Sequence, residues 1–222
     1  MTFKLGIITD IHADLGALQA ALQRMDDMGV DLILCAGDIV DGGAQPEQVI
    51  FLLRERLIPC ISGNHDRWAV RRQKDGQPGH EGDAQKLMLK PETVDWLAKL
   101  PAKWSRTIEG VRVVVVHGSP RSDMDGMYPD ATDADLESWL RQAEADVLIA
   151  GHTHVPLMLH APGGKLVVNP GALWRGAERS EAVMMLVDPS GGPSKAAERA
   201  QGGCFGVLEL PSKRWTQHRI TD

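Results

Sequence analysis

The chain has few of the features that mark secreted, disulfide-stabilised or membrane proteins. It holds three cysteines, Cys35, Cys60 and Cys204, with no CxxC spacing, which argues against a disulfide framework and against a structural zinc site. No apolar run approaches the length that a membrane helix needs. The first residues show no basic start followed by an apolar stretch, as a signal peptide would. We therefore expect a cytoplasmic protein that has no membrane partner.

Positive charge is also scarce. The 222 residues carry 24 Lys and Arg against 30 Asp and Glu, which gives a net charge of −6. Non-specific binding to nucleic acid needs a basic surface, so this balance argues against nucleic acid as a partner. It does not argue against a small anionic substrate, because the charge of a bound metal ion outweighs a distant surface average. The composition leaves the oligomeric state open.

What the sequence does have is an alternation of strand and helix patterns, and its hydrophobic content of 43 % is enough to bury a core. Short β-rich runs at 4–9, 32–36 and 57–62 are separated by stretches with apolar residues at helical spacing, at 15–28 and 46–56. Such alternation predicts a layered α/β arrangement.

The second half of the chain adds more strands. Helices are predicted at 91–100 and from Thr132 to about Ala145, and loops at 74–86 and 188–204. The predicted strands are 111–116, 147–150 and 166–168, followed by a β meander at 182–187, 205–210 and 214–220. No internal repeat is present, so we expect a single domain over residues 1–222.

Five apolar runs are each followed at once by side chains that bind metals or transfer protons. These side chains are Asp10, His12, Asp38, Asn64, His65, His117, His152 and His154. Because ligands bind beyond the carboxyl ends of strands in layered α/β folds, we expect all eight around one crevice. Taken singly, each has an ordinary alternative, such as a helix cap, a turn or a solvated surface histidine. The joint pattern favours a shared metal site.

The motifs in their order resemble those of the calcineurin-like metallophosphoesterase superfamily. They read Asp-x-His, Gly-Asp, Gly-Asn-His-Asp, His-Gly and Gly-His-Thr-His, with "NPGAL" at 169–173, and they span residues 5 to about 171. The resemblance implies an α/β fold that is a four-layer sandwich of two mixed β-sheets flanked by helices. This agrees with the strand–helix alternation and with the closing meander.

The resemblance also implies roles for the individual residues. One metal ion would be held by Asp10, His12, Asp38 and His154, and a second by Asp38, Asn64, His117 and His152. His65 would stand beside the scissile phosphate, and Asp66 would orient His65. The nitrogen- and oxygen-rich donor set lacks thiolates, so it suits two divalent transition metal ions. We expect manganese first, with iron, nickel, cobalt or zinc as alternatives.

Two departures from the protein Ser/Thr phosphatase branch point to the small bacterial-type phosphodiesterases. Gly42 stands where those phosphatases have a phosphate-binding Arg, and Asp66 stands in place of their Glu. We expect a dinuclear phosphoesterase that hydrolyses small, nucleotide-like phosphodiesters through attack by a metal-bridging hydroxide. Arg67 and Arg121 directly follow site motifs and could contact the substrate phosphate, although each could equally be a solvated surface charge.

Other functions remain open at this point. A phosphomonoesterase or a dinucleoside polyphosphate hydrolase would use the same centre, and loops 67–90 and 119–131 are expected to shape the pocket that separates these activities. An inactive scaffold of the same fold is a third alternative, although a scaffold has no physical need for a complete set of ligands. The acidic balance argues against a nuclease acting on long polyanions.

Overall fold

Two mixed β-sheets form the centre of the protein. The computed structural model describes residues 2–76, 88–176 and 203–220. The first sheet has the strand order β2-β1-β8-β9. Its strands are β1 (Phe3–Ile8), β2 (Leu32–Cys35), β8 (Cys204–Leu210) and β9 (Arg214–Arg219). β1 is parallel to β2 and antiparallel to β8, so an early strand of the chain lies between an early and a late neighbour.

The second sheet has the order β3-β4-β5-β7-β6. Its strands are β3 (Lys103–Ile108), β4 (Val111–Val116), β5 (Val147–Ile149), β6 (Leu157–Ala161) and β7 (Lys165–Asn169). The three central strands, β4, β5 and β7, run parallel, and each edge strand is antiparallel to its neighbour. The central strands are rich in Val, Leu and Ile because both of their faces are buried.

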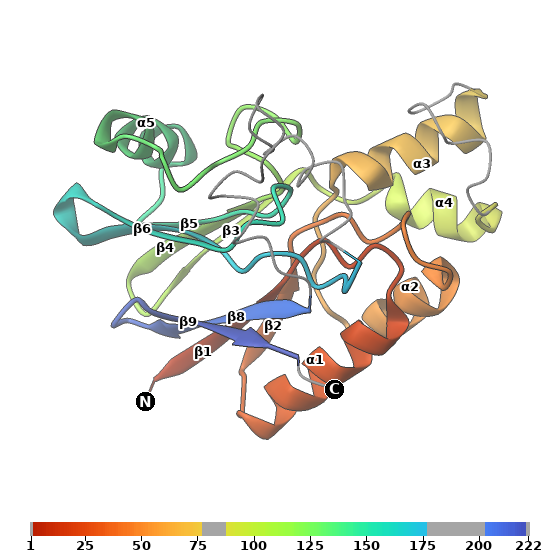
Figure 1. Cartoon of the computed structure of the whole chain (residues 1–222), viewed down its shortest axis with the longest axis horizontal. Helices are drawn as coiled ribbons and strands as arrows, with labels where there is room; N and C mark the ends of the chain where they lie inside the picture. Colours follow the sequence, from red (N-terminus) through yellow and green to blue (C-terminus); the bar gives the residue numbers. More distant parts are fainter. Residues whose placement is uncertain (1, 77–87, 177–202, 221–222) are drawn as a thin grey trace, which may run out of the picture.

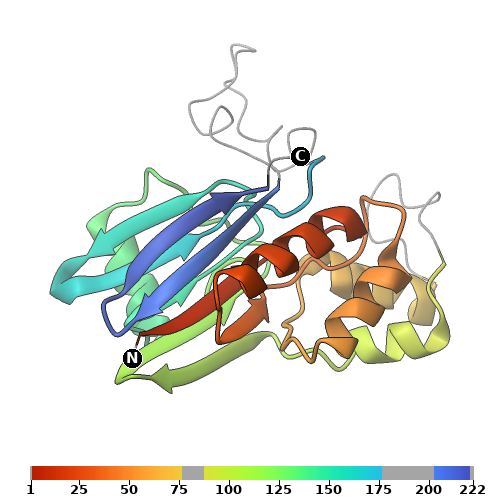
Figure 2. The same ribbon diagram turned by 90° about the horizontal axis from the view of Figure 1, so that it is seen from below.

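Helices cover the outer faces of the two sheets (Figures 1 and 2). The helices are α1 (Leu15–Asp27), α2 (Pro46–Glu55), α3 (Asn64–Asp75), α4 (Pro91–Leu97) and α5 (Asp133–Ala143), with a short 3-10 turn, η2, at Pro162–Gly164. In both views α2, α3 and α4 gather at one end of the molecule, beyond the ends of the strands. Asp14 caps α1 by accepting a hydrogen bond from the amide of Ala17.

Three buried hydrophobic clusters separate the layers. One cluster lies between the sheets and includes Leu5, Val115 and Leu208. A second packs α1 and α2 on the outer face of the first sheet, and the third packs α5 on the outer face of the second sheet. The alternation within β4, where Val115 faces one cluster and Val114 another, follows from the two-residue period of a strand. The predicted sandwich of two mixed sheets flanked by helices is confirmed.

One predicted strand is wrong. Residues 57–62 do not form a strand, and only an isolated bridge joins Cys60 to Cys35. Leu57 has φ 52°, a left-handed conformation that does not fit a strand, and Pro59 has no amide to donate. The amide of Ser62 then turns away from β2 to the carbonyl of Pro101. Ile58, Cys60 and Ile61 are buried although the run is not paired along its length, and Leu57 is exposed.

Other elements were not predicted. The edge strands β3 and β6 carry mixed patterns, and α3 was not predicted, because most of it falls in the expected loop 67–90. The predicted loop at 74–86 begins inside α3, and its residues 77–86 lie outside the described part of the chain, as do the predicted strand 182–187 and most of the loop 188–204. The single domain over 1–222 therefore stays a prediction. In the part of the chain that the structure describes, no helix is long and apolar enough to cross a membrane.

Candidate metal centre

The fold brings all eight predicted side chains to one end of the strands. β1 and β2 are parallel, and so are β4 and β5, so the segments that leave their carboxyl ends emerge on the same side. Asn64 and His65 join them because they form the first turn of α3. Ligand atoms within 4.8 Å of one another form three groups: Asp10, His12 and His154; His12, Asp38 and His65; and Asp38, His117 and His152.

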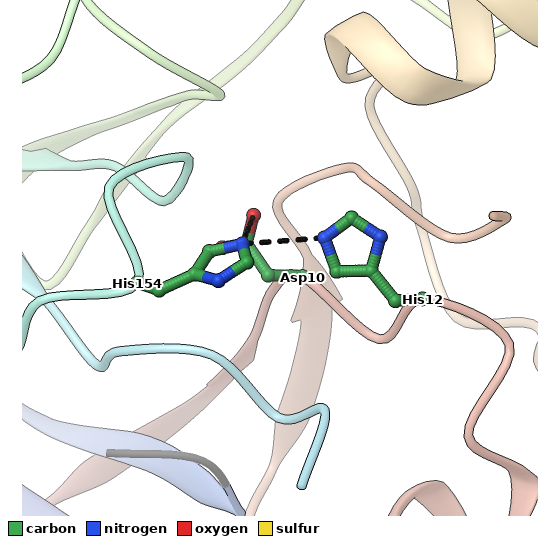
Figure 3. A group of neighbouring side chains, drawn as sticks. All are labelled: Asp10, His12 and His154. Atoms are coloured by element: carbon green, nitrogen blue, oxygen red, sulfur yellow. Dashed lines mark hydrogen bonds and ion pairs between the residues drawn. The ribbon is translucent and has the colours of Figure 1, made fainter. Parts of the chain in front are cut away.

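Figure 3 shows the first group, in which dashed lines join one ring nitrogen of His154 to the carboxylate of Asp10 and to the ring of His12. Nε2 of His154 lies 3.3 Å from Oδ1 of Asp10 and 3.2 Å from Nε2 of His12. The side chains come from two segments about 140 residues apart in sequence, and all three are buried. Three ligand atoms that converge in a buried space are what a cation site requires.

The third of these groups, Asp38, His117 and His152, surrounds Asn64. Oδ1 of Asn64 lies 3.0 Å from Nε2 of His117 and 3.0 Å from Nδ1 of His152. Asp38 completes this group, because its Oδ2 is 3.1 Å from Nε2 of His117. Asp38 also reaches the first group, with Oδ2 3.9 Å from Nε2 of His12. The carboxylate of Asp38 thus stands between the two groups, as a bridging ligand would.

The hydrogen bonds of His117 show that its neighbours suit a cation. Nδ1 of His117 lies 2.8 Å from the carbonyl of Ala36, and a carbonyl can only accept, so Nδ1 carries a proton. In the neutral ring Nε2 is then a bare lone pair, and it faces two further acceptors, the oxygens of Asn64 and Asp38. Three acceptors aimed at one another need a positive charge among them, either a proton or a metal ion.

The ionisation of the cluster follows from burial and from mutual contact. Burial opposes charge on Asp10 and Asp38, but the nearby histidines outweigh it, and the pKa of each carboxyl lies below its ordinary value. Burial and the neighbouring His65 lower the pKa of His12 to about 3, so His12 is neutral at neutral pH. Neutral imidazoles and ionised carboxylates are the forms that bind metal ions.

His117 behaves in the opposite way. Burial opposes its protonation, but the carboxylates of Asp38 and Asp10 prevail and raise its pKa to about 10. In the metal-free protein, a proton on His117 supplies the positive charge that the surrounding acceptors demand. A metal ion at this place would have to displace that proton.

Backbone strain is concentrated at the same residues. Five of the eight predicted side chains belong to non-glycine residues with positive φ, between 46° and 67°: Asp10, His12, Asp38, His152 and His154. This left-handed region is sparsely populated by such residues and costs on the order of 1 kcal/mol or more each. The strain turns each side chain inward immediately after its strand ends, and packing of the two sheets maintains it.

Glycines and one buried amide hold these turns in place. A Cβ on Gly63 would collide with the carboxylate of Asp38, and one on Gly151 would collide with the side chain of Thr9. Asn169 donates to the carbonyl of Gly151 at 2.7 Å and to Oγ1 of Thr153 at 3.1 Å. The "NPGAL" segment therefore positions the turn that carries His152 and His154.

The ring of His65 contacts a carboxylate that was not predicted. Nδ1 of His65 lies 3.3 Å from Oδ2 of Asp41, whose other oxygen accepts from Arg72 at 2.8 Å. Asp66 instead accepts from the backbone amides of Ile39, Val40 and Gly63. Residues i and i+1 of a helix do not face each other, so Asp66 would act on His65 through the backbone turn that it holds, and its predicted orienting role stays a prediction.

Sequence reasoning passed over Asp41, although it stands three residues after Asp38 in "GDIVDGG". Its side chain is only 6 % exposed, and its φ is 67°. A buried carboxylate in a strained turn next to the Gly-Asp motif is a signal that could have been used. Trp68 and Trp174 also went unnoticed: Trp68 packs edge-on to His65, with the ring centroids 4.8 Å apart, and Trp174 lies at 5.2 Å from His12.

The two predicted arginines lie beside the centre and not in it. Arg67 binds Asp123 through two hydrogen bonds of 2.7 and 2.9 Å. Arg121 is largely exposed and pairs with Asp125 at 3.1 Å. Both line a cavity of about 640 Å³ that reaches His117. The predicted loop 67–90 contributes to this cavity as a helix, because residues 67–75 belong to α3.

Comparison with known proteins gives the family. The Calcineurin-like phosphoesterase superfamily domain matches residues 3–192. A probable metallophosphoesterase of Methanothermobacter thermautotrophicus is 27 % identical over 187 residues, 84 % of this chain and 81 % of that protein. An uncharacterized protein of Methanocaldococcus jannaschii is 28 % identical over 176 residues, 77 % of this chain and 70 % of that protein.

A solved structure is similar over nearly the whole chain. The crystal structure of a metallophosphoesterase from Sphaerobacter thermophilus superposes with a TM-score of 0.70 and 26 % sequence identity, covering 99 % of this chain and 88 % of that one. The fold, the grouped metal-binding side chains and the family match agree with one another. The chain therefore belongs to the calcineurin-like phosphoesterase superfamily, and it is a metal-binding phosphoric ester hydrolase.

Proposed function

We propose that the protein is a dinuclear metal-dependent phosphoesterase that hydrolyses small, nucleotide-like phosphodiesters. The observation that carries this proposal is the position of Asp38, whose Oδ2 lies 3.1 Å from His117 of one group and 3.9 Å from His12 of the other. A carboxylate shared by two buried ligand groups suits a pair of cations better than a single one. We assign Asp10, His12, Asp38 and His154 to one ion, and Asp38, Asn64, His117 and His152 to the other.

The residues fit divalent transition metals by their chemistry. The donors are imidazole nitrogens and carboxylate or amide oxygens, without thiolates, a set that manganese, iron, cobalt, nickel and zinc all accept; manganese is our first choice. When bound, the two ions supply positive charge for the phosphate and a nucleophilic water at neutral pH. The side chain of Asp38 is already fixed in position, since its Oδ1 accepts a hydrogen bond from the amide of His65 at 2.9 Å.

His65 is the residue that would act on the leaving group. Its side chain is 26 % exposed, whereas its neighbour Asp41 is buried. The carboxylate of Asp41, 3.3 Å from Nδ1, fixes the orientation of the ring. A protonated His65 at the mouth of the centre would donate a proton to the departing alkoxide oxygen.

Two variants separate metal holding from proton transfer. We expect Asp38→Asn to lose metal, because the variant removes the charge shared by both groups. We expect His65→Gln to keep its metal and to lower kcat by about 10²- to 10⁴-fold, most for esters with poor leaving groups. Metal content of the purified variants and hydrolysis rates with added Mn²⁺ test both expectations. Full metal content and normal rates in both variants would remove the assigned roles.

Matched controls exist on the surface. His160 is exposed on β6 and Asp130 is exposed in the segment before α5, so His160→Gln and Asp130→Asn should match the wild type. The substrates are bis(4-nitrophenyl) phosphate, 4-nitrophenyl phosphate and a dinucleoside polyphosphate. Faster hydrolysis of the monoester or of the polyphosphate would replace the diesterase assignment. A metal-poor wild type without activity on all three would indicate a scaffold.

A further inference from the structure

The cavity beside His117 is lined mainly by basic and apolar side chains, although the chain as a whole is acidic. It has a volume of about 640 Å³ and lies between α3, the segment from α4 to β3, and the loop after β4. This volume is within the range of small-molecule sites. His117 and Ser119 form the part of its wall that borders the metal centre. A molecule whose phosphate lies at the centre can therefore extend into this cavity.

The lining of the cavity is cationic, although the chain as a whole has a net charge of −6. Four basic side chains line it, namely Arg67, Arg71, Lys103 and Arg121, against one carboxylate, Asp123. Asp123 is engaged by Arg67 through both of its oxygens. Within residues 2–76, 88–176 and 203–220, neither Arg71 nor Lys103 has a carboxylate partner.

The two walls of the cavity lead away from the metal centre in a regular way. On α3, Asn64, Arg67 and Arg71 follow the spacing i, i+3, i+7, so they share one face of the helix. Arg71 lies about 10 Å along the helix axis from Asn64, at 1.5 Å per residue. On the opposite wall, Lys103 pairs with Val116, the residue before His117. One wall thus has Arg71 on the same helix as the assigned ligand Asn64. The other has Lys103 opposite the residue that precedes the assigned ligand His117.

The lining also contains apolar side chains, among them Val70, Leu97, Leu100 and Pro120. Apolar side chains together with cations suit an organic group that carries a negative charge. A simple aryl or alkyl ester would leave Arg71 and Lys103 without a partner.

We propose that this cavity binds a second phosphate group of the substrate, held by Arg71 and Lys103, while the scissile phosphate lies at the metal centre. The inference rests on the proposed function and narrows it. The substrate class becomes phosphodiesters whose organic part bears a further, separate phosphate, such as a nucleoside phosphodiester with a phosphate on its other hydroxyl. A charge-assisted contact of Arg or Lys with phosphate is worth about tenfold in affinity.

A matched pair of substrates tests the proposal. The 4-nitrophenyl ester of thymidine 5′-phosphate is compared with the same ester bearing a 3′-phosphate, because both release 4-nitrophenolate from the same kind of centre. In the Mn²⁺-loaded wild type we expect kcat/KM to be about tenfold higher for the ester with the 3′-phosphate. In Arg71→Ala and in Lys103→Ala we expect this ratio to fall toward one.

Arg106→Ala is the matched control, because Arg106 is an exposed cation on β3, three residues after Lys103, and does not line the cavity. Its substrate ratio should equal that of the wild type. A wild-type ratio near one, or an equal change in Arg106→Ala and Lys103→Ala, would overturn the inference.

A binding measurement, which needs no hydrolysis, tests the cavity separately from the proposed function. Calorimetric titration of the Mn²⁺-loaded protein with thymidine 3′,5′-bisphosphate and with thymidine 5′-phosphate measures the second phosphate without any turnover. Absence of hydrolysis for both esters would sink the proposed function, while a preference for the bisphosphate that is lost in Arg71→Ala would still support the cavity. Equal affinity for the two nucleotides would reject the cavity, whatever the rates are.

Discussion

At the scale of single residues, the centre is a set of groups that are unfavourable alone and favourable together. Asp10 and Asp38 are buried carboxylates, which is costly unless positive charge lies next to them. His12 is buried and neutral, with a pKa of about 3, whereas His117 is buried and has a pKa of about 10. Two histidines of one cluster thus hold opposite protonation states at neutral pH, because the carboxylates of Asp38 and Asp10 prevail over burial at His117, whereas burial and the neighbouring His65 prevail at His12.

A pH dependence follows for the metal-free protein. The pKa of His117 is about 10 in the folded state and near 6.5 when unfolded, so between these values the folded state holds a proton that the unfolded state lacks. The contribution of His117 to the free energy of unfolding should therefore be complete below pH 6.5 and fall above it, by on the order of 1 kcal/mol per pH unit. Urea unfolding between pH 7 and 8.5, with a chelator present, measures this slope.

His117→Gln should lower the free energy of unfolding at pH 7 and also flatten its dependence on pH. His160→Gln, which changes an exposed histidine on β6, should keep the wild-type slope. A slope that persists unchanged in His117→Gln would assign the titration to another group.

At the scale of elements, the first turn of α3 joins the centre to the rest of the fold. Gly63 precedes the helix, and Asn64 and His65 lie in its first turn. The amide of His65 donates to Asp38, and Asp66 receives three backbone amides, two of them from the segment after Asp38. Burial and the nearby Asp38 raise the pKa of Asp66 to about 7. This turn therefore holds both an assigned ligand and the loop that carries the shared carboxylate.

Gly63→Ala should damage the centre through sterics alone. The backbone of Gly63 is extended, with φ −99°, so alanine fits the conformation, but its Cβ would collide with Asp38. We expect a loss of stability of about 1–3 kcal/mol together with weaker metal retention, measured by urea unfolding and metal analysis. Gly16→Ala, within α1, meets only the end of the Arg175 side chain at 2.9 Å and should retain metal. Equal retention by both variants would show that the space at Gly63 is not needed.

The same elements show which features of the fold and the centre can be predicted from the sequence. The convergence of the eight side chains at one end of the strands was predicted, because strand ends and polar residues are both visible in the sequence. The partner of His65 was not, since Asp41 is brought to it by the fold around Asp38. The strand predicted at 57–62 is wrong because a hydrophobic run indicates that residues are buried, not that their backbone pairs with another strand. α3 begins at Asn64 with polar residues whose packing partners come from other elements, so no local pattern marked it.

At the scale of the whole molecule, the centre ties both sheets together. Asp10 and Asp38 follow strands of the first sheet, whereas His117 and His154 follow strands of the second. Ions held between them would cross-link the two layers of the sandwich in addition to the buried cluster between the sheets. The stability of the protein should therefore depend on metal.

Removal of metal should lower the melting temperature. A ligand at 100 times its Kd stabilises the folded state by about 2.7 kcal/mol, and for a protein of this size that corresponds to about 5–10 °C. Thermal unfolding with Mn²⁺ and with excess chelator measures the difference. Asp38→Asn should melt at the same temperature in both conditions, and a full response to Mn²⁺ in that variant would contradict the role of Asp38 as the shared ligand.

The pairing of β1 with β8 has a consequence for biosynthesis. Phe3 lies opposite Leu210, so β1 must wait for β8, a strand made much later, before both of its edges are hydrogen-bonded. Asp10 and His12 extend directly from β1. A nascent chain halted before Cys204 would thus present an open β edge next to an immature centre, and catalytic competence would arrive only after β8 has been made.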